Sequence, residues 1–136
     1  MIASATLALR KAVREVLIAD QGLAARLGGA RIYDEAPAQV EPPYVAFADV
    51  RTRDWSSASG SGAEHFLALE IWSKHRGVLE CLEIAGLIEG VLDDAPLQVE
   101  GRHLVLIQLQ STETIRRDKG RLALARVTFR ALTEET

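Results

Sequence analysis

The strongest constraint on the fold is the alternation of residues along three stretches of the chain. From Ala63 to Ser73 every second residue falls on one face, namely His65, Leu67, Leu69 and Ile71. Two later stretches do the same, one with His103, Val105, Ile107 and Leu109, the other with Ala123, Ala125, Val127, Phe129 and Ala131. Successive side chains of a strand point to opposite faces, and the turn Asp118–Gly120 separates the last two stretches. The pattern therefore predicts a strand followed by a long antiparallel hairpin.

Helices are predicted before and between these strands. Ser4 is suited to cap a helix over about residues 5–20, ended by Gly22, with one more turn over 23–27. Short strands follow at 31–33 and 44–50, interrupted by Pro37, Pro42 and Pro43, which cannot donate to a ladder. A second helix is expected over about residues 76–93. Its apolar residues cover most of the circumference, and only Glu80, Glu83 and Gly90 mark a polar stripe.

This order of elements predicts an α+β fold. A mainly antiparallel sheet is expected to carry two principal helices on one face. The 136 residues are expected to form one domain over 1–136. The 48% hydrophobic content is typical of a globular chain.

Composition and charge exclude several classes of protein. The net charge of −3 argues against nucleic-acid binding through the whole surface. Cys81 is a lone cysteine, which rules out an internal disulfide framework and fits a reducing cytoplasm. The N-terminal stretch contains Arg10, Lys11 and Arg14, unlike a signal peptide, and no run is apolar enough to span a membrane.

The sequence offers no catalytic, cofactor or metal constellation. Histidines 65, 75 and 103 are scattered over strand, loop and strand, and Cys81 is expected to be a buried, inert thiol. A small enzyme or ligand-binding domain that uses His65, His103 and Glu70 remains the alternative from a different class.

Three features exceed what a monomer needs. The second helix is either sandwiched between sheet and first helix or a subunit contact, with Leu87 and Val91 as candidates. The segment Arg51–Trp55 leads into a Ser/Gly-rich loop that ends at Gly62. Arg51, Arg53 and Trp55 are candidate interface residues, unless the tryptophan folds back onto its own sheet. Four cations cluster at the hairpin turn: Arg116, Arg117, Lys119 and Arg121. They form either a solvated tip or a contact with an acidic partner or with DNA.

Several pieces in order along the chain resemble a known family. They are the segment Gly29–Pro37 with Pro42–Val45, then Ile71-Trp72-Ser73 before a helix, Arg117-Asp118 in a hairpin, and Phe129–Thr133. Together they resemble the tail terminators, or tail-completion proteins, of long-tailed phages and gene transfer agents.

The resemblance implies a non-enzymatic structural virion protein without cofactors. Such a protein caps the tail tube and joins it to the head-side connector as a ring, typically a hexamer, with sheets lining a channel and helices outside. The implied partners are other copies of the chain, the tail tube protein, a connector or stopper protein, and DNA in passage. It implies assembly in the bacterial cytoplasm followed by a place at the head–tail junction, with no membrane. A head-completion adaptor or stopper is the structural alternative.

Overall fold

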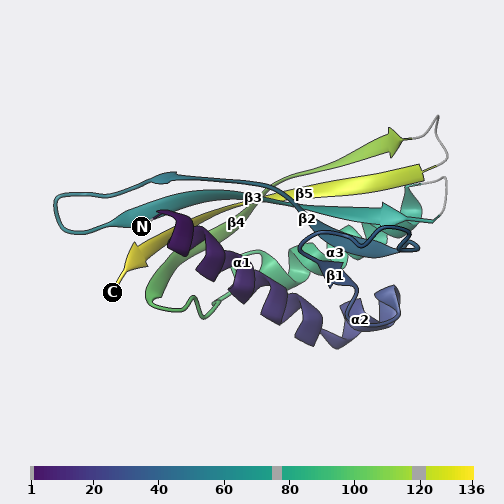
Figure 1. Cartoon of the computed structure of the whole chain (residues 1–136), viewed down its shortest axis with the longest axis horizontal. Coiled ribbons are helices and arrows are strands. Elements are labelled where there is room, and N and C mark those ends of the chain that lie inside the picture. The colour runs from purple at the N-terminus through teal and green to yellow at the C-terminus, as the bar shows by residue number, and fades with distance from the viewer. Residues whose placement is uncertain (1, 75–77, 118–121) are drawn as a thin grey trace.

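The first helix leads directly into a second one. The computed structural model describes residues 2–74, 78–117 and 122–136. Within them α1 (Ile2–Ala19) is followed by α2 (Gln21–Leu27), β1 (Ile32–Tyr33), β2 (Tyr44–Asp54), β3 (Gly62–Ser73), α3 (Leu79–Leu92), β4 (Arg102–Arg117) and β5 (Leu122–Glu135). Figure 1 shows the three helices on one side of the sheet.

The sheet contains both parallel and antiparallel pairs. Its strand order is β1-β2-β3-β5-β4. The short β1 runs parallel to β2, whereas the pairs β2–β3, β3–β5 and β4–β5 are antiparallel. The α+β class is therefore confirmed, with a mixed sheet and a third short helix, α2, that the expected pair of principal helices did not include.

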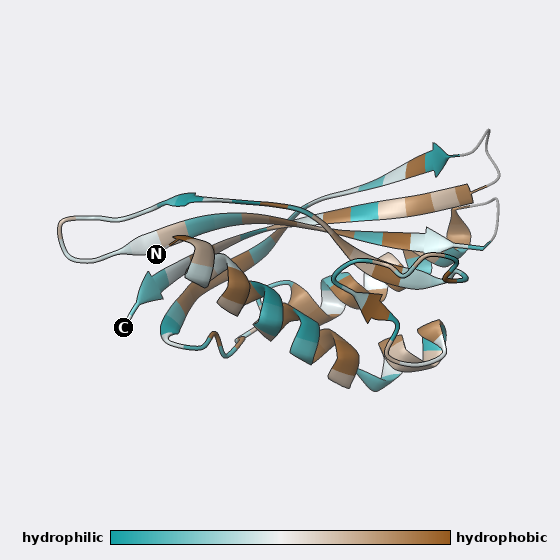
Figure 2. Cartoon of the chain, viewed as in Figure 1, coloured by the Kyte–Doolittle hydropathy of each residue, from teal (hydrophilic) through white to brown (hydrophobic). Residues whose placement is uncertain are grey.

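The core lies between the helices and one face of the sheet. The predicted alternation of β3 and β5 is confirmed, because His65, Leu67, Leu69 and Ile71 are fully buried and their β5 counterparts are buried with them. Helix α1 contributes Leu9, Val13 and Leu17 to the same cluster. Figure 2 shows apolar residues along the helices and central strands, while the projecting β2–β3 hairpin is mostly pale. We call the sheet face away from the helices the open face.

The predicted start of the first helix and the predicted roles of Ser4 and Gly22 were wrong. The helix begins at Ile2, so Ser4 lies inside its first turn, where its hydroxyl accepts a hydrogen bond of 2.7 Å from Arg102. The helix ends at Ala19, within one residue of the expected end at 20, and Gly22 lies inside α2 instead of ending α1. The carboxylate of Asp20 caps α2 by accepting from the Leu23 amide at 2.9 Å, and Gly28 ends α2 with φ +79°.

Two strands also differ from the prediction. Strand β2 continues to Asp54 because Arg51–Asp54 pair with β3, which shortens the loop to residues 55–61. In β4, the register shifts between Leu104 and Leu106. This bulge at Val105 turns Leu104 toward the core in place of His103 and Val105, which are both exposed.

The polar stripe predicted for helix α3 differs from the side that the structure exposes. Its described start is Leu79, and residues 76–77 of the predicted helix lie outside the described residues. Glu80 is buried and accepts hydrogen bonds from the Ser73 hydroxyl at 2.8 Å and the Lys74 amide at 3.3 Å. The exposed large hydrophobic residues of this helix are Leu79, Leu82 and Leu87. The helix is therefore buried along one side only, and its outer side is partly apolar.

Candidate assembly surfaces

The first candidate surface is the β2–β3 hairpin, which projects beyond the rest of the molecule (Figure 1). Arg51 and Arg53 belong to the strand and lie on the open face. Their guanidinium carbons are 4.9 and 5.9 Å from the centre of the Phe66 ring. These contacts fit cation–π interactions, so the two arginines are held against the sheet.

Trp55 lies where β2 ends and the hairpin loop begins. Its amide donates to the Gly62 carbonyl at 2.9 Å, and its side chain is next to Gly62. The residue is 39% exposed. The indole ring of Trp55 thus packs partly on its own hairpin and is partly accessible to another molecule. The loop beyond it is closed by hydrogen bonds between the Ser57 and Gly60 backbones.

A ladder of ion pairs crosses the open face, and the sequence analysis did not find it. The Glu64 carboxylate accepts from Arg130 at 2.7 Å and from Arg53 at 2.5 Å. These hydrogen bonds, that of Arg130 first, hold the pKa of Glu64 below its usual range. Arg126 binds Glu70 at 2.6 Å and Glu113 at 3.4 Å. Both arginines alternate with buried β5 residues, but their acidic partners become evident only once β3 and β4 are placed beside β5.

Leu87 and Val91 lie on a different surface from the arginines. Leu87 is 36% exposed on α3, and Val91 packs partly against the core. Helix α3 lies on the helix side of the sheet, while Arg51 and Arg53 lie on the open face. The structure thus divides the five candidate interface residues between two surfaces.

The basic residues lie at the opposite end of the sheet from the hairpin. Arg116 and Arg117 are exposed at the end of β4, opposite Ala123 and Leu122. Lys119 and Arg121 lie outside the described residues. The length of β3 separates the two ends by roughly 36 Å, at about 3.3 Å per strand residue. One molecule therefore has a hairpin at one end and cations at the other.

A chain of hydroxyl groups surrounds the buried His65. Thr52 Oγ1 lies 3.1 Å from His65 Nδ1, and Thr133 Oγ1 lies 2.9 Å from Nε2. Thr6 extends the chain from α1 to Thr52 at 2.7 Å. Burial, together with the positive charge of Arg102, lowers the pKa of His65 from its ordinary 6.5 to about 4. His65 is therefore neutral at physiological pH and joins α1 to three strands.

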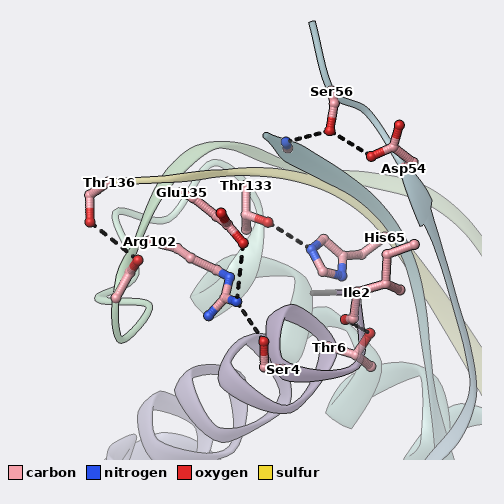
Figure 3. A network of polar contacts seen from close by, with 12 residues as sticks. Ile2, Ser4, Thr6, Asp54, Ser56, His65, Arg102, Thr133, Glu135 and Thr136 are labelled. Carbon is pink, nitrogen blue, oxygen red and sulfur yellow. Dashed lines mark hydrogen bonds and ion pairs between the residues drawn. The ribbon is translucent and has the colours of Figure 1, made fainter. Parts of the chain in front are cut away.

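Arg102 ties the same end of the molecule together (Figure 3). Its side chain is only 13% exposed, and it bridges Ser4 of α1 at 2.7 Å and Glu135 of β5 at 3.9 Å. A pocket of about 200 Å³ lies beside it, lined also by Asp54 and Ser56 of the hairpin. The two contacts of Arg102 tie the start of β4 to α1 and to the C-terminal strand.

The structure does not bring the alternative enzyme residues together. His65 is buried on the core side, Glu70 lies on the open face, where it binds Arg126, and His103 is exposed on β4. The Cys81 thiol is buried, which raises its pKa. Among residues 2–74, 78–117 and 122–136, no cluster of three or more potential metal ligands is present. None of the helices in this described part is long and apolar enough to span a membrane.

An α+β fold with separate candidate surfaces on a projecting hairpin, on the outer side of α3 and at a basic strand end is the architecture of a candidate assembly protein. Comparison with protein families makes the assignment specific. Residues 11–134 match the family described as "Tail completion protein gp17". The chain belongs to this family, which confirms the resemblance found in the sequence.

A solved virion structure contains a chain of the same architecture. It comes from the virion of a native gene transfer agent (GTA) particle and is 27% identical to this chain, with a TM-score of 0.88. The match covers 96% of this chain and 97% of the solved one. A search of the curated proteins gives no match.

Proposed function

We propose that this chain is a non-enzymatic structural protein of a phage-like tail, forming a ring that caps the tail tube and joins it to the head-side connector. The single observation that carries the proposal is the similarity over almost the full length to a chain of a gene transfer agent virion. The family match over residues 11–134 supports the same role. The chain acts as one tail-terminator-like domain over 1–136.

The partners follow from this role. Copies of the chain form a ring, proposed to be a hexamer, between the tail tube protein and a connector or stopper protein. DNA passes through the ring, and no membrane takes part. Assembly takes place in the bacterial cytoplasm, and the finished ring stays at the head–tail junction of a phage or gene transfer agent particle.

The candidate surfaces divide between these partners. Trp55, with Arg51 and Arg53 behind it, contacts a neighbouring subunit or the tail tube. Leu87 and Val91 belong to a subunit contact on α3. Arg116 and Arg117, with Lys119 and Arg121 beyond them in sequence, face the channel or an adjoining ring. The distance between the hairpin and the basic end supports two different partners.

Electron microscopy of particles made without the chain tests the proposal. Filled heads and tail tubes should accumulate unjoined, and added purified protein should bind tube ends and restore joining. Recovery of the protein on heads while tubes stay bare would make it a head-completion adaptor. Normal joined particles without the chain would overturn the proposal.

A further inference from the structure

The outer side of α3 combines exposed leucines with exposed glycines. Leu79 is 71% exposed and Leu82 is 40% exposed, and Leu87 completes the exposed set on this helix. Between them lie Gly86 and Gly90, where an added Cβ would meet no atom within 4 Å. The helix carries three glutamates and no Lys or Arg. Glu80 is buried and Glu89 accepts a hydrogen bond from Thr112 of β4, so Glu83 is the glutamate exposed on the outer side. The outer side of α3 is therefore partly apolar, with one exposed carboxylate and two exposed glycines.

Four residues on the outer side of α3 have the spacing that surrounds a hole for a side chain of another helix. Residues at positions i, i+3, i+4 and i+7 surround one such hole on a helix surface. Glu83, Gly86, Leu87 and Gly90 have this spacing. Two of its four corners are glycines with open space above them, which leaves room for an apolar side chain between Leu87 and Glu83.

Helix α1 presents a side chain that fits this hole. Leu7 is 70% exposed and lies on the outer side of α1. Lys11 follows one turn later, and its side chain is 63% exposed. Helix α1 carries three cations and one acidic residue. The outer sides of α1 and α3 are thus both partly apolar, and exposed Lys11 on α1 is opposite in charge to exposed Glu83 on α3.

These two surfaces cannot meet within one molecule. Leu9 and Val13 of α1 and Ile84 of α3 turn their side chains into the common core, so Leu7 and Gly86 point outward. We propose that Leu7 of one copy inserts between Glu83, Gly86, Leu87 and Gly90 of the next, with Lys11 beside Glu83.

This contact rests on the proposed ring and names the helices that join its subunits. It uses a different surface on each partner, which is the type of contact that closes into rings. Glu83 also binds Arg26 of its own chain at 2.5 Å, so Lys11 adds a second cation. The Lys11–Glu100 pair that it replaces is exposed at 3.7 Å and therefore weak.

Two single variants and their mixture test the contact by sedimentation velocity. Leu7→Gln removes the inserted side chain, and Gly86→Gln fills the hole while raising helix propensity. Each variant alone should associate roughly thirtyfold more weakly than the unchanged chain. Their mixture should form dimers and stop there, because each pair retains one intact contact. Ala25→Gln, a matched change on exposed α2, should assemble as the unchanged chain does. Normal assembly of either variant, or a mixture without dimers, would overturn the contact.

Cross-linking extends the test to weak association. Chains with Leu7→Cys and Gly90→Cys are mixed and oxidised, with the buried Cys81 left in place. Mixed disulfide dimers should exceed homodimers of either chain, and equal yields would refute the contact. Mixed dimers from a protein that fails to bind tube ends would reject the tail-capping role and leave the contact standing. Tube capping without preferred mixed dimers would support the tail-capping role and refute the contact between α1 and α3.

Discussion

At the scale of single residues, His65 makes stability depend on pH. Its pKa is about 4 in the folded chain and 6.5 ordinarily. Between pH 6.5 and 4, His65 is protonated in the unfolded chain and neutral in the folded chain. The free energy of unfolding therefore falls as the pH drops from 6.5 to 4. The loss is on the order of 3 kcal/mol. Above pH 6.5 the residue is neutral in both states and this dependence ends.

Urea unfolding at pH 7.5, 6 and 5 measures this effect. His65→Gln cannot titrate, so its stability should decline less over this range, whatever its absolute value. His103→Gln removes an exposed histidine of the same sheet and should keep the slope of the unchanged chain. Equal slopes for His65→Gln and the unchanged chain would assign the acid sensitivity to other groups.

Gly62 is the residue with the least room for a side chain among the glycines described. An added Cβ would lie 2.7 Å from the Trp55 carbonyl oxygen and 3.1 Å from that of Thr133. These are backbone atoms of neighbouring strands and yield little, so Gly62→Ala should cost about 1–3 kcal/mol. At Gly60, in the same loop, nothing lies within 4 Å, and Gly60→Ala should change stability by less than about 0.5 kcal/mol. Thermal unfolding compares Gly62→Ala with Gly60→Ala. An equal loss of stability in both variants would contradict the close approach of backbone atoms to Gly62.

At the scale of elements, the sequence was informative where burial leaves a regular pattern. The alternation in β3 and β5 correctly predicted which face is buried. The Val105 bulge could not be predicted, because one extra residue leaves no signature in an apolar strand. The end of β2 was also missed, since Arg51–Asp54 are polar and become a strand only through pairing with β3.

The projecting hairpin gives a prediction at this scale. Trp55→Ala removes a ring that is 39% exposed beside the hairpin loop, so the thermal midpoint of the subunit should change little. Binding to neighbouring subunits or the tail tube should fall roughly thirtyfold, as for a lost hot-spot tryptophan. Trp72 is the matched control. It stacks on Tyr44 with ring centres 6.2 Å apart, so Trp72→Ala should lower the midpoint. A Trp55 variant that loses stability but binds normally would make the ring structural.

At the scale of the whole molecule, the sequence indicated which residues are candidates for contact surfaces. It did not indicate where those residues lie in the folded molecule. Arginine and tryptophan in a polar stretch indicate contact residues by type alone. Their division between the open face and α3 depends on long-range pairings. The ladder shows the same limit, because Glu70 and Arg126 meet across 56 positions of sequence. Only the assembled sheet shows that the hairpin and the cations lie at opposite ends.

That separation gives the last prediction. If the basic end faces DNA or an adjoining ring, removing its charge should impair the particle and spare the subunit. Arg116→Ser with Arg117→Ser removes two cations from the described end of β4, and Lys119→Ser with Arg121→Ser extends the change to all four. Because exposed substitutions usually change stability by less than about 0.5 kcal/mol each, folding should persist.

DNA transfer by the particles should fall several-fold with the double change and further with the quadruple one. Since contacts with phosphates weaken with salt, the difference should narrow at high ionic strength. Equal transfer by all variants would leave the basic end a solvated strand tip.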